Sequence, residues 1–192
     1  GEKGLLDVMY DYKKIKNDWA KEELNKNDNL NIWRYRPLLP IEDNSERPPL
    51  RVGWTPLYES KDLAEELGLK TVYIKDDGLN PTGSLKDRAS AMAAVKAGEA
   101  GAKTVACSST GNAASSLAGN VASMPGEMKA VIFVPERAPE GKVTQLLIYG
   151  AEVVSVQGSY EEAFYLSEKA IEKWDWYNRN AAINPYMVEC KK

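Results

Sequence analysis

From residue 71 to residue 174 the sequence alternates between two kinds of segment, and this alternation restricts the fold more than any other feature. Four short stretches rich in β-branched or aromatic residues are expected to be strands, at residues 71–77, 103–109, 129–135 and 151–158. Each is followed by a segment of helical character, at residues 85–101, 113–124, 140–150 and 160–174. Strands and helices that alternate through short links are typical of a parallel sheet covered on both faces. We therefore predict an α/β fold with a doubly wound, mostly parallel sheet.

The composition is that of a globular protein and argues against several kinds of partner. The chain has 192 residues, of which 43% are hydrophobic and 28% are charged, which is enough for one sizeable core. Its net charge is −3 and its cationic residues are scattered, so we expect neither a nucleic-acid partner nor a membrane surface. The apolar runs are shorter than the ~18 residues of a membrane span, and the charged first residues do not resemble a signal peptide. We expect a cytoplasmic location.

The 192 residues contain no histidine and only two cysteines, Cys107 and Cys190. A nucleophile activated by histidine and a histidine-ligated metal site are therefore excluded within them. The two cysteines show neither metal-binding spacing nor a disulfide framework, so we expect no metal and a reducing compartment. Catalysis has to use lysine, carboxylates, hydroxyl groups, backbone amides or a bound cofactor.

The first part of the chain does not share the alternating pattern. Residues 10–25 have the character of a loose helix, and the segment 36–60 carries five prolines and is expected to be irregular and extended. Ser60 is a candidate N-cap for a helix at 61–69.

Two junctions between a strand and the next helix carry unusual residues, and ligands of parallel sheets gather at such junctions. The first is NPTGSLKDR, residues 80–88. Ser84 is a candidate N-cap, and Asp87, three residues later, suits a capping box, which puts Lys86 in the first helical turn. The positive end of the helix and shielding from water would favour a neutral amine there, a nucleophile that can bond to an aldehyde.

Two other roles are open to this lysine on the residues alone. A solvated surface charge is the ordinary role of a lone lysine. A phosphate clamp is the third alternative, although the pattern GxxxxGK[ST] that would support it is absent.

The second junction is SSTGN, residues 108–112, which follows an expected strand and opens a helix of small residues. Exposed amides at a helix start, with hydroxyl groups beside them, form an anion pocket that suits a carboxylate or a phosphate. Gly111 permits close approach of the backbone, and Asn112 offers both a donor and an acceptor. An ordinary helix cap is the alternative interpretation.

The lysine motif NPTGSLKDR followed along the chain by SSTGNAASS resembles the pyridoxal-phosphate enzymes of the tryptophan-synthase-β fold, also called fold type II. Among these, the sequence is most similar to the threonine synthase family. LLDVMYDY, WRYRPLLP, GWTPLYES and NPYMVECKK are similar to segments of that family in the same order. The resemblance therefore extends over nearly the whole chain.

The resemblance implies a role for individual residues. Lys86 matches the lysine that holds pyridoxal 5'-phosphate as a Schiff base and later moves protons. Asn112 matches the asparagine that hydrogen-bonds the ring oxygen of the cofactor. Ser109, Thr110 and Gly111 match the loop that binds the α-carboxylate of the substrate.

Further residues follow from the same resemblance. Ser84 and Asn80 match positions near the cofactor, whereas Asp87 and Arg88 complete the lysine motif and are expected to be structural.

The family converts O-phospho-L-homoserine and water to L-threonine and phosphate, and this is the activity that the resemblance implies. Residues 176–192 match the region that binds the substrate phosphate, where Asn184, Asn180 and Lys191 are candidates and Arg179 is a further one. Met187 stands where the family often has a basic residue.

Family members are much longer than this chain, and their second half supplies a glycine-rich loop for the cofactor phosphate. Such a loop is not found after residue 112, and Cys190 replaces a usual glycine. We therefore expect the N-terminal portion of a threonine-synthase-like enzyme that alone binds the cofactor weakly and turns over no substrate. Residues 1–85 are predicted to form an extension and part of a large domain, 86–184 a small α/β domain, and 185–192 the return to the large domain.

The expected partners are a small amino-acid substrate and either a second copy of the chain or the missing C-terminal half. Two alternatives remain open at this point. One is a related pyridoxal-phosphate enzyme that acts on phosphoserine or threonine, and the other is a non-catalytic fragment of the same fold.

Overall fold

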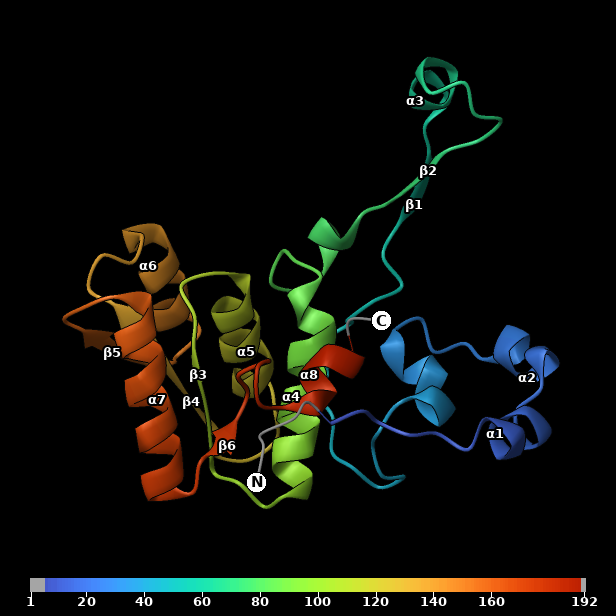
Figure 1. Ribbon diagram of the computed structural model, residues 1–192. Helices are drawn as coiled ribbons and strands as arrows, with labels where there is room; N and C mark the ends of the chain where they lie inside the picture. Colours follow the sequence, from blue (N-terminus) through green and yellow to red (C-terminus); the bar gives the residue numbers. More distant parts are fainter. Residues whose placement is uncertain (1–5, 191–192) are drawn as a thin grey trace.

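The computed structural model of the chain describes residues 6–190. One side of the molecule contains a parallel sheet of four strands in the order β5-β4-β3-β6 (Figure 1). The strands are β3 (Thr104–Ser108), β4 (Lys129–Pro135), β5 (Glu152–Val156) and β6 (Tyr177–Asn178). All three neighbouring pairs run parallel. The prediction of an α/β fold with a parallel sheet is therefore confirmed.

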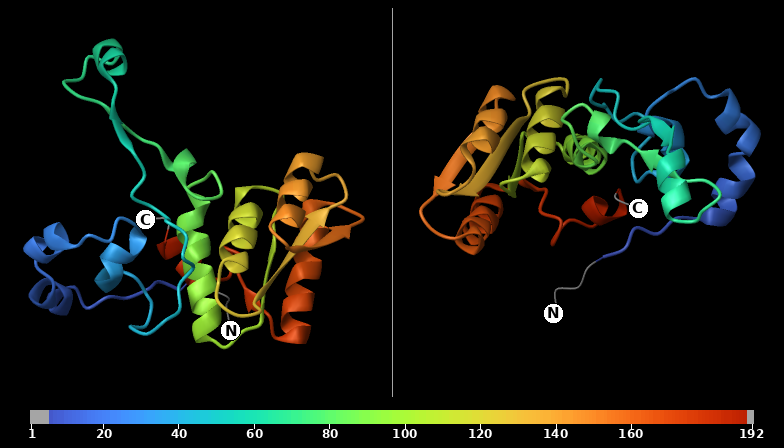
Figure 2. Two further views of the ribbon diagram at one scale, coloured as in Figure 1. Left: turned by 180° about the vertical axis from the view of Figure 1, so that it is seen from behind. Right: turned by 90° about the horizontal axis from the view of Figure 1, so that it is seen from above.

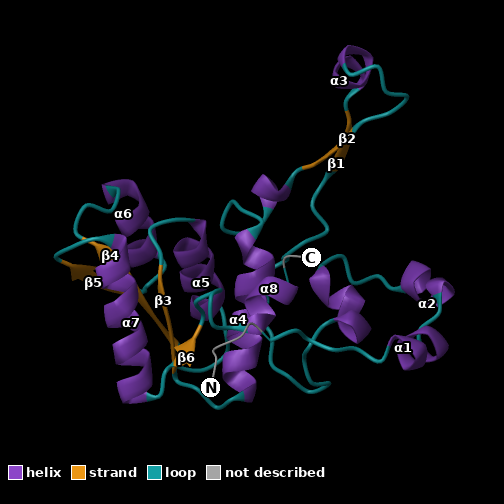
Figure 3. Ribbon diagram, in the orientation of Figure 1, coloured by secondary structure: helices purple, strands orange, loops and turns teal. Residues whose placement is uncertain are grey.

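Helices cover both faces of this sheet (Figure 3). They are α4 (Lys86–Glu99), α5 (Asn112–Ala122), α6 (Glu140–Ile148) and α7 (Tyr160–Trp174). The view from above shows α5 and α6 on one face and α7 on the other, with α4 beside α5 (Figure 2). All four begin and end within two residues of the segments that the sequence predicts as helices.

The strands bury alternate side chains toward the two helical layers. Val105 and Cys107 of β3 belong to the core cluster shared with α4, α5 and α6. Ala106, between them, and Phe133 of β4 belong to the cluster that packs on Ala170 of α7. This alternation follows from the two-residue period of a strand and explains why the strands are continuously apolar.

The first predicted strand, residues 71–77, does not join this sheet, so that part of the prediction is wrong. Only β2 (Tyr73–Lys75) is extended, and it pairs antiparallel with β1 (Leu57–Glu59). Together with α3 (Lys61–Glu66) the two strands form a ribbon that projects away from the sheet (Figure 1). Both strands are exposed at every position, so no buried face ties the ribbon to the parallel sheet.

The place of the fourth strand is taken by β6, which the sequence pattern does not reveal. It pairs with β3 through Val105–Tyr177 and Ala106–Asn178. A strand of two residues has no measurable alternation, which is why it escapes a search for periodic patterns.

In the N-terminal part of the chain, residues 32–38 pack on α4, whereas the helices before them bury no residue. Residues 10–25 form two short helices, α1 (Tyr12–Asp18) and α2 (Lys21–Lys26), instead of one. The 3-10 helix η1 (Ile32–Leu38) buries Ile32 and Trp33 against α4, and α8 (Pro185–Glu189) packs on the same helix. The predicted domain boundaries at 85 and 184 stay a prediction.

Ser60 lies directly before α3 as predicted, but its side chain makes no capping hydrogen bond. A full capping box forms instead at α7, between Ser159 and Glu162.

Within residues 6–190 no helix is both long enough and apolar enough to cross a bilayer. In the same range no three acidic or cysteine side chains gather in a group that could hold a metal ion.

Candidate functional site

The turn before α4 places Lys86 at the first position of that helix. The turn closes through the Gly83 amide, which donates to the Asn80 carbonyl at 2.8 Å, and Gly83 has φ +81°, a conformation that favours glycine. The Ser84 hydroxyl accepts from the Lys86 amide at 3.2 Å. The predicted capping box is wrong in its partners, because the Asp87 amide donates to the Ser84 carbonyl instead of its hydroxyl.

Asp87 holds this turn against the neighbouring helix. Its carboxylate is fully buried and accepts from the amide and the hydroxyl of Thr82, at 2.8 and 2.9 Å, and from the amide group of Asn120 on α5 at 2.8 Å. Burial raises the pKa of the Asp87 carboxyl, while the hydrogen bonds from Thr82 and Asn120 oppose that rise. The carboxylate therefore joins three segments that meet at the start of α4.

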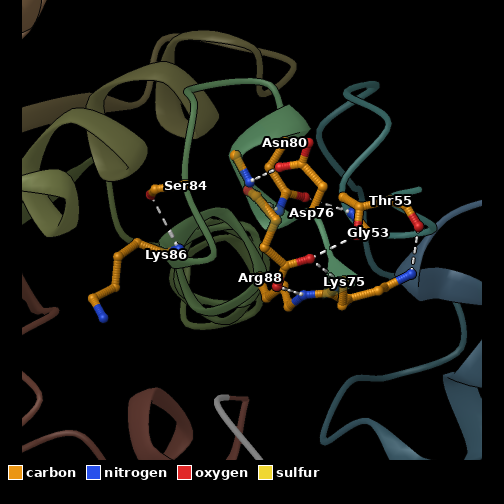
Figure 4. Close-up of polar contacts among 10 residues, drawn as sticks. Gly53, Thr55, Lys75, Asp76, Asn80, Ser84, Lys86 and Arg88 are labelled. Carbon is orange, nitrogen blue, oxygen red and sulfur yellow. Dashed lines mark hydrogen bonds and ion pairs between the residues drawn. The ribbon is translucent and has the colours of Figure 1, made fainter. Parts of the chain in front are cut away.

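Arg88 is the centre of a second polar cluster on a different side of α4 (Figure 4). Its guanidinium binds both carboxylate oxygens of Asp77, at 3.1 and 2.8 Å, and the Thr55 hydroxyl donates to the same carboxylate at 2.6 Å. Asn80 accepts from the Gly53 amide and donates to the Asp77 carbonyl, both at 2.9 Å. Both ends of the Asn80 amide are thus engaged in joining Gly53 to the turn at 77–80, and Asp77 joins this turn to Arg88 of α4.

The Asp77–Arg88 pair gives an expected pH dependence of stability. The hydrogen bonds from Arg88, and more weakly from Thr55, hold the pKa of the Asp77 carboxyl below its usual value. The folded state therefore favours the ionised carboxylate, and this contribution is present at neutral pH and lost as the pH falls through the lowered pKa. We expect Asp77→Asn to reduce the free energy of unfolding by about 1 kcal/mol at pH 7.

Chemical denaturation at several pH values tests this expectation. The difference between wild type and Asp77→Asn should shrink below about pH 4, near the ordinary pKa of an aspartate. Asp76→Asn is the matched control, since Asp76 caps the adjacent turn without binding Arg88. A difference that stays constant down to pH 2 contradicts the assignment.

The side chain of Lys86 points away from the Arg88 cluster (Figure 4). It is half-buried, and within residues 6–190 its amine makes no hydrogen bond or ion pair. Its backbone is held by the Ser84 hydroxyl, so the position of the amine is set by the first turn of α4. A fixed backbone and an unpaired amine suit a covalent bond to a small molecule.

Residues 109–111 connect β3 to α5, and with Asn112, the first residue of α5, they form the turn 109–112. The Ser109 amide donates to the Phe133 carbonyl at 3.2 Å, and the Gly111 amide donates to the Ser109 hydroxyl at 3.2 Å. The amides of Thr110 and Asn112 have no partner in the described part of the chain. A Cβ atom added to Gly111 would meet nothing within 4 Å, so open space lies in front of this turn.

The two junctions are brought to the same edge of the sheet. Because α4 leads to the beginning of β3 and α5 leads away from its end, both helices start at the carboxyl edge. The hydroxyl groups of Ser90 and Ser116 join the two helices at 2.6 Å. Lys86 precedes Ser90 by one turn, and Asn112 precedes Ser116 by one turn, so each lies on the same face of its helix as the joined serine.

The candidate site, formed by Lys86 and residues 109–112, is open to solvent and is not an enclosed pocket. Lys86 is half-buried, Ser109 to Gly111 are half-buried, and Asn112 is exposed. Two large hollows, of about 980 and 750 Å³, lie along the N-terminal segment instead. The smaller one is lined by Leu85 and Arg88 but not by Lys86.

Asn180 and Asn184 both lie inside the protein. Asn180 accepts from the Ser108 amide at 2.9 Å and donates to Glu168 at 2.7 Å, so it supports the end of β3 directly behind the turn. Asn184 caps α8 by accepting from the Tyr186 amide at 3.0 Å, and its NH₂ group donates to two further oxygens. In this arrangement neither amide is free to bind a substrate.

The other described candidates from residues 176–192 are also buried, so they do not form an exposed site for an anion. Arg179 is buried and donates to the Ser90 hydroxyl at 3.3 Å, and burial lowers the pKa of its guanidinium. Met187 is fully buried in the main core cluster. Lys191 lies outside the described residues.

One residue of the site was not identified from the sequence. Lys142, in the first turn of α6, donates to the side-chain oxygen of Asn112 at 2.9 Å. The two residues are far apart in the chain, and Lys142 is one of many lysines in the sequence. Only the packing of α6 beside α5 distinguishes it.

Comparison with known proteins identifies the family of the chain. A family model described as "Pyridoxal-phosphate dependent enzyme" matches residues 49–192, a range that includes both junctions. The chain belongs to this family. The match covers the whole parallel sheet and the projecting ribbon, and it leaves out only the first N-terminal helices.

Curated relatives within the family are threonine synthases. The enzyme of Methanocaldococcus jannaschii is 38% identical over 190 residues, and that of Methanosarcina acetivorans is 42% identical over 192 residues. Each alignment covers 98% of this chain but only 46% and 45% of the relative. The resemblance to threonine synthase is thus confirmed, and the chain spans about half the length of these relatives.

Solved structures share the fold at lower identity. Threonine deaminase isoform 2 from Solanum lycopersicum has a TM-score of 0.63 at 18% identity, covering 96% of this chain and 44% of that one. Diaminopropionate ammonia lyase from Escherichia coli has a TM-score of 0.61 at 20% identity, covering 71% and 44%. These two structures share the α/β fold of the chain, and together with the family match they identify it as the fold of fold-type-II pyridoxal-phosphate enzymes.

Lys86 and residues 109–112 fit the aldehyde end of the pyridoxal phosphate that this family uses. An unpaired primary amine suits the aldehyde carbon, free amides at Thr110 and Asn112 suit an anionic group, and the space in front of Gly111 is open. In the described residues after the turn, the glycines stand singly and offer no glycine-rich cradle for the cofactor phosphate. In the described part of the chain, Lys86 and the turn would therefore suit the aldehyde of that cofactor and an anionic group, and no glycine-rich phosphate cradle follows the turn.

Proposed function

We propose that this chain carries the lysine-bearing part of a pyridoxal-phosphate-dependent lyase that converts O-phospho-L-homoserine and water to L-threonine and phosphate. The observation that carries the proposal is the placement of the unpaired Lys86 amine and the turn 109–112 at one edge of the sheet. The threonine synthase relatives support the choice of reaction.

Lys86 has two tasks in this proposal. Its Nζ would hold the cofactor by a bond to the aldehyde carbon, and as a free amine it would accept the proton from the substrate Cα. Bound pyridoxal phosphate supplies an electron sink for the bond that breaks at Cα. The fixed first turn of α4 keeps the amine within reach of that proton.

The turn 109–112 binds the other end of the amino acid. The free amides of Thr110 and Asn112, with the Ser109 hydroxyl beside them, bind the α-carboxylate at the beginning of α5, where the helix dipole favours an anion. Asn112 would donate from its NH₂ group to the ring oxygen of a bound cofactor. Holding the carboxylate there fixes the direction of the Cα–H bond relative to Lys86.

Two features separate this function from one of its two alternatives, the non-catalytic fragment. A related enzyme that acts on phosphoserine or threonine would use the same amine and turn. The two enzymes are therefore distinguished by which substrate loses its leaving group. A non-catalytic fragment needs neither an unpaired Lys86 nor open space before Gly111, and both are present.

Phosphate release by the intact protein that contains these 192 residues tests the reaction. We expect phosphate and threonine to form in equal amounts from O-phospho-L-homoserine, and at least about tenfold less phosphate from O-phospho-L-serine, because the shorter substrate shifts its phosphate relative to the carboxylate site. Preferred turnover of O-phospho-L-serine would establish the related enzyme. Formation of ammonia from threonine would establish a deaminase.

A further inference from the structure

Lys142 is fixed in front of the turn by the packing of α6. Its Nζ donates to Asn112 Oδ1 at 2.9 Å, and the side chain is half-buried. Four residues later, Leu146 is 2% exposed and belongs to the core cluster that also contains Leu117 of α5. The ammonium group therefore reaches Asn112 from a helix that is anchored in the same core as α5.

The polarity of this hydrogen bond decides which way the Asn112 amide faces. An ammonium group only donates, so it can bind the oxygen of the amide and not its nitrogen. The NH₂ group of Asn112 makes no hydrogen bond within residues 6–190, and the side chain is exposed. With the oxygen held by Lys142, both N–H bonds remain available to an acceptor outside the protein.

We propose that Lys142 is a positioning residue, which holds the Asn112 amide with its NH₂ group directed outward so that it donates to an acceptor oxygen of the bound ligand. The proposal rests on the proposed function, in which that oxygen belongs to the cofactor ring. Lys142 itself does not touch the reacting atoms. Its effect passes through Asn112, and without it the amide can rotate and present its oxygen, which repels an acceptor.

Two substitutions and one control test the proposal in the intact protein. Lys142→Met keeps the length and the apolar part of the side chain but removes the donor, whereas Lys142→Arg keeps a donor. Lys129→Met is the control, because Lys129 is exposed, binds Glu152 and begins β4 at the opposite edge of the sheet. The measured quantity is the Kd of pyridoxal 5'-phosphate, obtained from an absorbance titration.

We expect Lys142→Met to raise this Kd by about 3- to 10-fold, the loss that one oriented hydrogen bond produces. Lys142→Arg should return it to within about twofold of wild type, and Lys129→Met should leave it unchanged. In an Asn112→Ala background, Lys142→Met should have no further effect, because the partner through which it acts is absent. An equal effect in that background, or no effect in the wild type, overturns the proposal.

A measurement without cofactor separates this proposal from the proposed function. The side-chain NH₂ resonances of Asn112, assigned by their loss in Asn112→Asp, should shift in Lys142→Met and stay in place in Lys129→Met. Unchanged resonances in Lys142→Met overturn the positioning role even if the cofactor binds. Shifted resonances in a protein that binds no cofactor support the positioning role and refute the proposed function.

Discussion

Lys86→Ala should abolish covalent attachment of pyridoxal 5'-phosphate to the intact protein. The amine is the only group proposed to bond to the cofactor aldehyde, and alanine leaves nothing in its place. Borohydride reduction followed by mass spectrometry of the peptides measures the outcome directly. The wild type should carry one reduced adduct on the peptide that contains Lys86, and Lys86→Ala should carry none.

Lys103→Ala is the matched control for this experiment. Lys103 is exposed and follows the C-terminal end of α4, at the opposite end of the helix from Lys86. Its removal should leave the adduct at the wild-type level. An adduct of undiminished yield in Lys86→Ala, at any other lysine, would falsify the assignment of Lys86 as the cofactor-bonding residue.

Asp87→Ala should be the most destabilising polar substitution near the site. It removes the acceptor for the amide and hydroxyl of Thr82 and for the amide group of Asn120, all of them buried. Buried donors left without an acceptor cost about 1–3 kcal/mol each in the least favourable case. Since the raised pKa of the carboxyl shows that its own burial is costly, we expect a net loss of about 3 kcal/mol in the free energy of unfolding.

Urea denaturation followed by circular dichroism measures this loss. Asp62→Ala in α3 is the control, because Asp62 is exposed in the first turn of a helix on the projecting ribbon. It should change the free energy of unfolding by less than about 0.5 kcal/mol. A loss of similar size in both variants contradicts the role assigned to Asp87.

The periodic parts of the fold could be predicted from the sequence, and the reasons are local. α7 begins at Tyr160 and ends at Trp174 as its apolar spacing predicts, and β4 covers its predicted range. The ribbon could not be predicted in the same way, because the stretch around Tyr73 has strand-like composition whichever sheet it joins. Composition reports that a segment is extended, while its partner strand is decided by packing with distant residues.

The candidate site shows the same difference between local features, which the sequence predicts, and contacts between distant residues, which it does not. The sequence motifs locate Lys86 and the turn at Asn112, because both depend on residues that are adjacent in the chain. Lys142 could not be found, since its contact with Asn112 depends on how two helices pack. Asn184 is the reverse case. The sequence motif makes it a candidate for substrate binding, whereas the structure shows that its side chain caps α8.

The contacts that Arg88 makes across the turn before α4 have a consequence for insertions and deletions. A residue added or removed between Asn80 and Lys86 would change the length of that turn, whereas α4 itself is held in place by its packing on α5. Asp77 would then no longer lie where the Arg88 guanidinium binds it, and Asn80 would no longer lie where it accepts from the Gly53 amide. The connection that precedes this helix is therefore under a constraint on its length that is independent of its composition.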